Sequence, residues 1–293
     1  MLRFLKIFCI SAVCLIEISG CSPNQEKMEK VESQQLEQSE ADDKKESENT
    51  KEERVDLSNV FNEINGCAVL YSPTENQYSL YNKDMAKQEV SPYSTFKIIS
   101  TLLGLHNKII KDETSTMNYN GIQYQNSDWN GDLTLQKAFQ TSCIWYFRQI
   151  INDVGKEEVE KELNELEYGN CDVSEWEGSN INPYEELNGF WLDSSLKISP
   201  IEQVEVLSKI FEGESIYDSE SIEILKRVML IQDNEEEKIY GKTGSGSNGE
   251  AWFIGFTEKE QQRNYFAIYL NDSLQGEQIS GSLAKEIALR IIE

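Results

Sequence analysis

Two residues three positions apart, Ser94 and Lys97, have the types and spacing of a nucleophile and its base. They open a largely apolar run over 98–105 that follows a turn at Pro92, and this pattern predicts a helix. Because residues three apart share a helix face, the Lys97 amine can reach the Ser94 hydroxyl. A buried helix would lower the pKa of the amine, and a neutral lysine can take a proton from serine.

The same pair has a simpler interpretation, a hydroxyl at a helix start beside a solvated ammonium, so the motif is weak by itself. A Ser-His-Asp triad is the usual alternative for a reactive serine, and the chain has one histidine, His106. His106 lies twelve residues beyond Ser94 on the same predicted helix, about 18 Å along its axis. It therefore cannot serve Ser94, and we expect it at the helix C-terminus.

Three later segments carry polar groups that would complete such a site. Ser142 precedes an aromatic run at 145–147, where its hydroxyl would relay a proton or only cap a helix. The Tyr-Gly-Asn segment at 168–170 follows a predicted helix and is, in isolation, an ordinary helix stop. Both segments leave the structural and the functional interpretation open.

The third segment, Lys242-Thr243-Gly244, ends a predicted strand and continues into Ser245 and further small residues. Small residues let a substrate lie along a strand edge, where Thr243 would donate a hydrogen bond and Lys242 would attract a carboxylate. The N–H of Ser94 and one just past Gly244 would form an oxyanion hole. A glycine-rich hairpin is the alternative for this segment alone.

The elements that must position these groups divide the chain into a sheet and a helical insertion. Alternating apolar residues predict five strands, and helical periodicity predicts helices near both ends of the folded part. The predicted strands are 66–71, 78–81, 238–243, 251–256 and 265–270, and the flanking helices are 57–64 and 282–292. Residues 94–230 carry helices and loops, so we expect a split α/β (α+β) lobe around a helical insertion.

The first 55 residues differ from the rest in composition. Residues 1–20 have a basic start and a short apolar core, which predicts an export signal that ends before Cys21. Small residues before that cysteine resemble a bacterial lipobox, so Cys21 would carry a lipid anchor to the membrane. Residues 21–55 would form an acidic flexible tether, because they contain no aromatic residue and no glycine. We therefore expect residues 56–293 to fold outside the cytoplasmic membrane.

Charge and cysteine usage exclude several classes of partner. The chain has a net charge of −25, of which −21 remains on residues 56–293, so nucleic acid and anionic lipid surfaces are unsuitable partners. Cys67, Cys143 and Cys171 follow the tether, and an odd number permits at most one pair. The apolar neighbours of Cys67 and Cys143 predict buried unpaired thiols. No His or Cys spacing suggests a metal site.

The order of the motifs resembles that of class D serine β-lactamases, over about residues 57–293. This order is S-x-x-K, S-x-I, Y-G-N, Phe190-Trp191-Leu192 and K-T-G. The resemblance implies a five-stranded antiparallel sheet flanked by N- and C-terminal helices, with an inserted helical lobe and the active site in the cleft between them. It also implies hydrolysis of β-lactams, with no cofactor other than CO2.

The resemblance assigns roles residue by residue. Ser94 would be acylated, and Lys97, carboxylated by CO2 as N6-carboxylysine, would be the general base. Ser142 would relay protons, and the Trp191 indole would donate a hydrogen bond to the carbamate. The groups that would bind the substrate are Tyr168, Asn170, Lys242, Thr243, Gly244 and Ser245.

The chain departs from the family pattern at two positions. Ile144 replaces a usual valine. Ala284 stands where enzymes of this class commonly have a carboxylate-binding arginine, which would leave that task to Lys242 and Thr243, with Ser245 or Lys285 as a further group. The alternative function is that of a penicillin-sensing domain, which is acylated but scarcely deacylated. Because such sensors are attached to membrane helices and a signalling module, the signal and tether favour the enzyme.

Overall fold

The computed structural model describes residues 50–234, 237–274 and 278–292, so the predicted signal peptide and Cys21 lie outside the described residues. A seven-stranded sheet has the order β1-β3-β2-β7-β6-β5-β4. Its strands are β1 Lys51–Arg54, β2 Gly66–Ser72, β3 Gln77–Tyr81, β4 Leu230–Asp233, β5 Lys238–Ser245, β6 Glu250–Lys259 and β7 Gln262–Asn271. Neighbouring strands are antiparallel except β1, which pairs parallel with β3.

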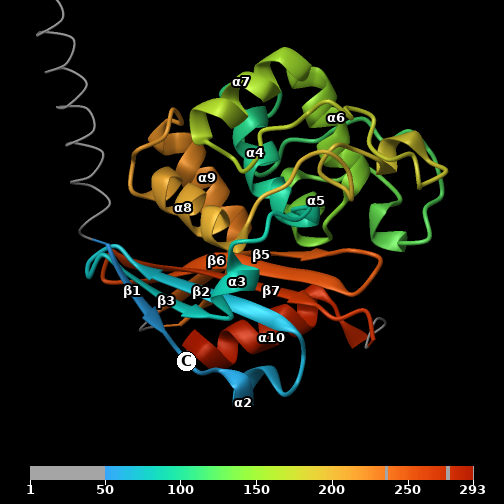
Figure 1. The fold of residues 1–293 in the computed structure, drawn as a ribbon. Helices are drawn as coiled ribbons and strands as arrows, with labels where there is room; N and C mark the ends of the chain where they lie inside the picture. The colour runs from blue at the N-terminus through green and yellow to red at the C-terminus, as the bar shows by residue number, and fades with distance from the viewer. Residues whose placement is uncertain (1–49, 235–236, 275–277, 293) are drawn as a thin grey trace, which may run out of the picture. The chain divides into compact units, whose positions relative to one another are not determined.

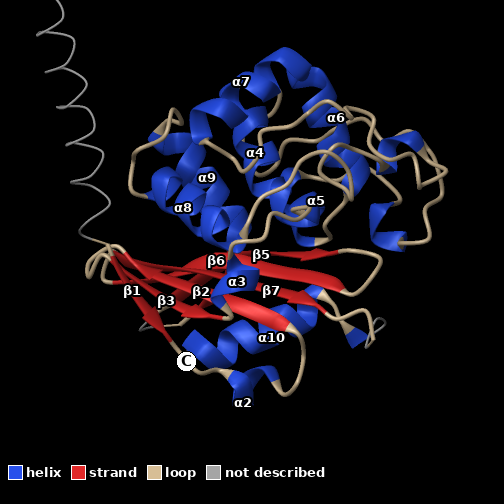
Figure 2. Ribbon diagram, viewed as in Figure 1, coloured by secondary structure: helices blue, strands red, loops and turns tan. Residues whose placement is uncertain are grey.

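Helices cover both faces of this sheet (Figures 1 and 2). The C-terminal helix α10 (Gly281–Ile292) and the short α2 (Ser58–Phe61) lie on one face. The predicted helical lobe is present and lies on the other face. It contains α4 Lys97–His106, α5 Leu135–Gln140, α6 Ile144–Val154, α7 Lys156–Leu166, α8 Pro200–Phe211 and α9 Ser219–Met229. The shorter turns are α3 Lys83–Ala86 and the 3-10 helices η1 Tyr93–Phe96, η2 Ser127–Trp129 and η3 Glu185–Leu187.

Two hydrophobic cores sandwich the sheet, and central strands contribute alternate residues to each. In β6, Trp252 and Ile254 face the core shared with the helical lobe, whereas Ala251 and Phe253 face α10. This alternation follows from the two-residue period of a strand, and burial on both faces explains the nearly continuous apolar sequence of β6. The same burial fixes β5, which carries Lys242 and Thr243, between β6 and β4.

The predicted five-stranded antiparallel sheet is wrong at its two edges, where the structure adds β1 and β4. All four residues of β1 are exposed, so its sequence, KEER, has no apolar alternation to reveal a strand. Its register with β3 is instead fixed by backbone hydrogen bonds, Lys51 N to Asn76 O at 3.0 Å and Val55 N to Leu80 O at 3.1 Å. Residues 51–54 therefore belong to the sheet, although the tether was predicted to reach residue 55.

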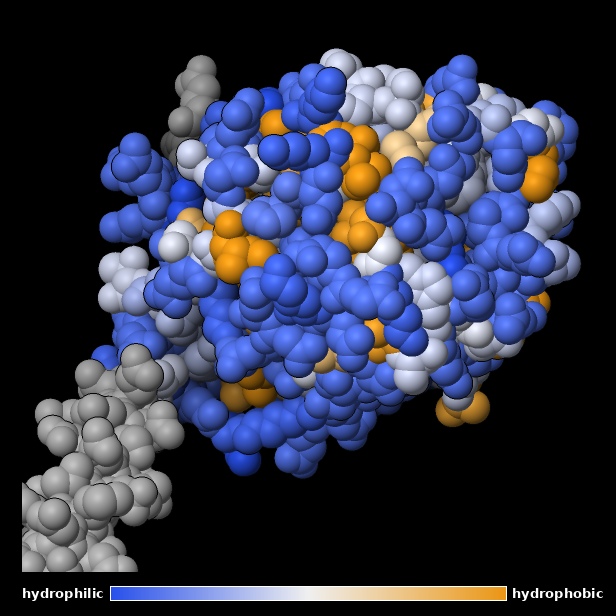
Figure 3. Space-filling model, turned by 90° about the horizontal axis from the view of Figure 1, so that it is seen from above, coloured by the Kyte–Doolittle hydropathy of each residue, from blue (hydrophilic) through white to orange (hydrophobic). Residues whose placement is uncertain are grey.

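The surface of the helical lobe is largely hydrophilic, with scattered apolar side chains (Figure 3). This distribution agrees with the acidic composition of the folded part. Among the helices of the described ranges, none is long and apolar enough to cross a membrane.

The edge strand β1 should contribute measurably to stability. A chain that begins at Asp56 should be about 1–3 kcal/mol less stable to urea than one that begins at Thr50, because the hydrogen bonds of β1 are lost and the β3 edge is opened. The chain that begins at Thr50 should match the full chain. Equal unfolding midpoints for the two truncated chains would show that β1 adds nothing.

Candidate active site

The predicted contact between Ser94 and Lys97 is present at the junction of η1 and α4. Lys97 Nζ lies 2.9 Å from Ser94 Oγ. The Lys97 side chain is completely buried, and this burial lowers the pKa of its amine to about 7. Ser94 remains partly exposed. Because burial favours the neutral amine, Lys97 can accept the serine proton through this contact near neutral pH.

Contacts from distant segments hold the turn that presents Ser94. Tyr93 has a left-handed backbone with φ of +49°, and its N–H donates to Trp191 O at 3.0 Å. Trp252 Nε1 donates to Ser91 O at 3.0 Å, which ties the turn to the sheet. Gln203 Nε2 donates to Thr95 Oγ1 at 3.0 Å from α8. The sequence alone does not reveal these supports, because a left-handed tyrosine has no local sequence signal.

Ser142 and Lys242 meet across a separation of 100 residues. Lys242 Nζ donates to Ser142 Oγ at 3.0 Å and to Thr243 O at 2.9 Å. Lys242 is 4% exposed, and its pKa lies well below the usual lysine range because of burial and, second, the charge of nearby Lys97. Ser142 itself has φ of +57°, an uncommon conformation for a residue with a side chain. The two predicted motifs therefore converge beside Lys97.

The backbone of β5 lies directly against the Ser94 turn at Gly244. A Cβ on Gly244 would be 3.3 Å from Pro92 O and 3.4 Å from Ser94 N. This close approach explains why glycine follows Lys242 and Thr243 here. It also places the backbone of β5 beside the Ser94 N–H, one of the two donors predicted for an oxyanion hole.

Trp191 is buried next to the lysine motif. It is 1% exposed, and its ring stacks on Phe96 with centroids 5.5 Å apart. Within the part of the chain that the structure describes, its indole N–H has no hydrogen-bond partner. A buried donor without a partner is costly. The site therefore fits an additional acceptor, and a carboxylated Lys97 would supply one.

Two predicted substrate-binding residues, Tyr168 and Asn170, make contacts within the protein. Tyr168 is 1% exposed and packs edge-on against Phe96 with ring centroids 5.7 Å apart, so it lies behind the Ser94 turn. Asn170 donates to Ser195 O and accepts from Lys197 N, each at 2.9 Å. Both side chains thus make contacts within the protein around the loop between α7 and α8, and their contact with a substrate stays a prediction.

The expected positions at the start of α10 also need correction. Ala284 is fully buried in the core between α10 and the sheet, so it does not face the site. Gly281 of α10 packs closely against β5, since a Cβ there would be 2.7 Å from Thr243 Cβ. Ser245 Oγ accepts a hydrogen bond from Gly281 N at 2.9 Å. This bond fixes Ser245 as a link between β5 and α10.

The cysteine prediction is confirmed for the thiols that the structure describes. Cys67 and Cys143 are buried and unpaired, and Cys171 is half-buried and unpaired. Burial raises the pKa of both Cys67 and Cys143 to about 12, so neither is a reactive thiolate. Across the described residues no cluster of His, Cys, Asp or Glu could hold a metal ion.

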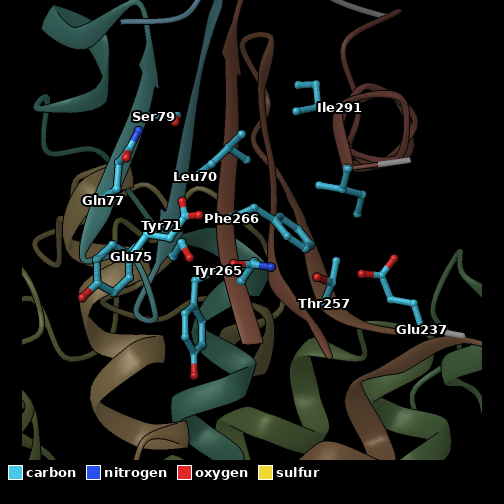
Figure 4. Close-up of a pocket in the computed structure, with 13 residues that line it drawn as sticks. Leu70, Tyr71, Glu75, Gln77, Ser79, Glu237, Thr257, Tyr265, Phe266 and Ile291 are labelled. Carbon is cyan, nitrogen blue, oxygen red and sulfur yellow. The ribbon is translucent and has the colours of Figure 1, made fainter. Parts of the chain in front are cut away.

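A pocket of about 260 Å³ lies elsewhere on the sheet (Figure 4). Side chains of β2, β3, β6 and β7 and the end of α10 line it, among them Leu70, Phe266 and Ile291 with the carboxylates of Glu75 and Glu237. Its lining contains none of the predicted site residues. The candidate active site is therefore defined by the contacts of Ser94, Lys97, Ser142 and Lys242. This pocket is separate from it.

Comparison with known proteins agrees with this geometry. The family model of the penicillin binding protein transpeptidase domain matches residues 37–293. The chain belongs to this family of penicillin-recognising serine proteins. The resemblance to class D β-lactamases is confirmed by a class D β-lactamase structure from Bacillus subtilis, with a TM-score of 0.72 and 32% identity over 81% of this chain and 94% of that chain.

Two curated relatives have similar identity but different lengths. Probable beta-lactamase YbxI of Bacillus subtilis is 33% identical over 82% of this chain and 84% of that protein. Regulatory protein BlaR1 of Bacillus licheniformis is 34% identical over 83% of this chain, but the match spans only 39% of BlaR1. An enzyme and a regulatory protein are thus both similar to this domain.

The unusual lysine can be tested directly. An NMR titration of the Lys97 side chain should give a midpoint near 7, because burial disfavours the ammonium form. Ser94→Ala should leave that midpoint within about one unit, since burial is the main cause of the shift. A midpoint near 10 would contradict the burial argument.

Proposed function

We propose that the protein hydrolyses β-lactam antibiotics, penicillins first among them, through an acyl-enzyme on Ser94. The observation that carries this proposal is the 2.9 Å contact between Ser94 Oγ and the fully buried Lys97 amine. The similarity to a class D β-lactamase structure and to YbxI supports the same reaction.

Acylation uses the groups that the fold gathers. Ser94 Oγ attacks the lactam carbonyl carbon while its proton passes to the Lys97 side chain. The developing oxyanion accepts hydrogen bonds from the Ser94 N–H and the N–H after Gly244. The lactam C–N bond then breaks, and its nitrogen takes a proton by way of Ser142, whose hydroxyl Lys242 holds at 3.0 Å.

Deacylation consumes one water. The water attacks the ester carbonyl as its proton passes to the Lys97 side chain, the C–O bond to Ser94 breaks, and Ser94 regains a proton. Lys242 and Thr243 bind the substrate carboxylate by hydrogen bonding, together with nearby polar groups, because Ala284 cannot supply a cation there.

The base for both steps is proposed to be N6-carboxylated Lys97. Carboxylation requires a neutral amine and CO2, and it supplies an anionic oxygen base in the same position. The depressed pKa of Lys97 and the unpartnered N–H of Trp191 support it, because the first makes the amine nucleophilic and the second offers a donor.

The acyl-enzyme can be measured by intact-mass spectrometry. Mixing with benzylpenicillin should add the mass of the intact antibiotic at Ser94, and Ser94→Ala should show no adduct. An adduct on another residue, or none with any β-lactam tried, would end the proposal.

The lifetime of that adduct separates the enzyme from a second candidate, a β-lactam sensor, which the 34% identity to BlaR1 supports. Hydrolase action predicts rapid loss of the adduct with release of ring-opened product. A persistent adduct with stoichiometric product would instead identify a sensor domain.

Trp191 should matter through the carboxylated lysine. Trp191→Ala should lower the deacylation rate about 10²-fold or more, since it impairs the general base, and acylation should fall less. Added bicarbonate should restore part of the loss, most visibly at mildly acid pH. Ile181→Ala, on the same loop and 74% exposed, is the matched control and should behave as wild type. Activity that is indifferent to bicarbonate in wild type and Trp191→Ala, without a carbamate signal in labelled-CO2 NMR, would leave an unmodified lysine as the base.

We also propose that Cys21 carries a lipid that anchors the domain outside the cytoplasmic membrane after removal of residues 1–20. The apolar stretch and the small residues before Cys21 support this anchor. Cys21→Ala should release soluble protein with unchanged turnover, whereas Ser22→Ala should stay membrane-bound. Equal membrane fractions for the two variants would refute the anchor.

A further inference from the structure

The side chain of Arg148 is buried in the helical lobe, with 3% of its surface exposed. It belongs to α6, about one turn beyond the Ser142 turn that precedes this helix. Burying a guanidinium is costly unless hydrogen bonds and an opposite charge compensate. The described partners of Arg148 that do so all lie on the loop between α7 and α8, which also carries Trp191.

The guanidinium contacts this loop in two ways. Its Nη1 donates to Trp176 O at 2.6 Å, and its Nη2 pairs with Glu177. Its central carbon lies 5.5 Å from the ring centroid of Trp176 and 6.0 Å from that of Trp191. A planar guanidinium can stack on rings while its N–H groups bond in the same plane, which a lysine ammonium cannot do.

The ion pair is the weaker part of this arrangement. The side chain of Glu177 is 69% exposed, so water and salt screen its charge. The ring contacts and the hydrogen bond to Trp176 O do not depend on this exposed carboxylate. They are therefore the contacts that restrict the loop.

A row of rings connects Arg148 to the lysine motif. Trp176 stacks on Phe190 with centroids 5.2 Å apart, and Phe190 meets Trp191 edge-on at 5.0 Å. Trp191 in turn stacks on Phe96, the residue before Lys97, at 5.5 Å. Gly189 leaves room for the indole, since a Cβ there would be 2.5 Å from the Trp191 ring. The indole is thus held by Phe96, Phe190, Gly189 and Arg148.

We propose that Arg148 is a positioning residue that fixes the Trp191 indole, and through it the N–H donor that holds the carboxylated Lys97. This inference rests on the proposed function, because the donor matters only if Lys97 is the base. Arg148 itself touches neither Ser94 nor the substrate. It acts by holding the loop that carries Trp191 against α6, the helix that follows Ser142.

The first test measures how activity depends on bicarbonate in Arg148→Met and Arg148→Lys. Both should need about tenfold more bicarbonate for half-maximal activity, with most activity recovered at saturation, because a displaced donor weakens the carbamate. Arg148→Lys should not restore the wild-type bicarbonate requirement, since an ammonium cannot stack and bond as the guanidinium does. Arg290→Met, which removes an exposed arginine of α10, is the control and should match wild type. Lost activity with an unchanged bicarbonate requirement would overturn the proposal, since it would reflect folding alone.

The second test detects a change in the surroundings of the Trp191 indole by NMR and does not depend on the carbamate. The ¹⁵N–H resonance of its indole, assigned with Trp191→Phe, should shift in Arg148→Met and stay in place in Arg290→Met. An unshifted resonance would overturn the positioning role. If wild type shows no bicarbonate dependence and no carbamate signal, the lysine chemistry of the proposed function fails, while the indole resonance still decides whether Arg148 positions Trp191.

Discussion

The burial of the Lys97 amine beside Ser94 is the constraint on which the site depends. An ammonium in a dry interior is costly, so the group loses its proton instead and its pKa falls from 10.5 to about 7. That difference corresponds to a penalty on the order of 5 kcal/mol against the charged form. The apolar residues packed around α4 keep water away from the Lys97 amine. The lysine can therefore act as a base at neutral pH.

A second lysine, Lys242, is buried nearby. Its pKa is lowered by burial first and by the charge of Lys97 second. Because α4 belongs to the helical lobe and β5 to the sheet, this coupling exists only when both parts of the fold are assembled. The Ser142 hydroxyl accepts a hydrogen bond from Lys242, so the turn before α6 belongs to the same cluster.

The loop between α7 and α8 packs against the turn that carries Ser94. Its main-chain contact, Trp191 O to Tyr93 N, supports the turn that presents Ser94, and its rings pack against Phe96. The indole N–H of Trp191 is a buried polar group of this loop that has no hydrogen-bond partner among the described residues. A buried donor without a partner is costly, so this N–H offers a place for the acceptor that a carboxylated Lys97 would supply.

The sequence by itself determined the local features of this protein. The spacing of Ser94 and Lys97 placed them on one helix face, the position of His106 excluded a triad, and two-residue periodicity located five strands, because these properties depend only on the chain nearby. The tertiary structure decided what depends on distant segments. The strand β1 is set by backbone pairing that its exposed side chains do not reveal, and the contact of Ser142 with Lys242 spans 100 residues. Tyr168 and Ala284 are buried by packing from other elements, and Arg148 is enclosed by a loop that begins after α7, so no local pattern could have shown which way these side chains face.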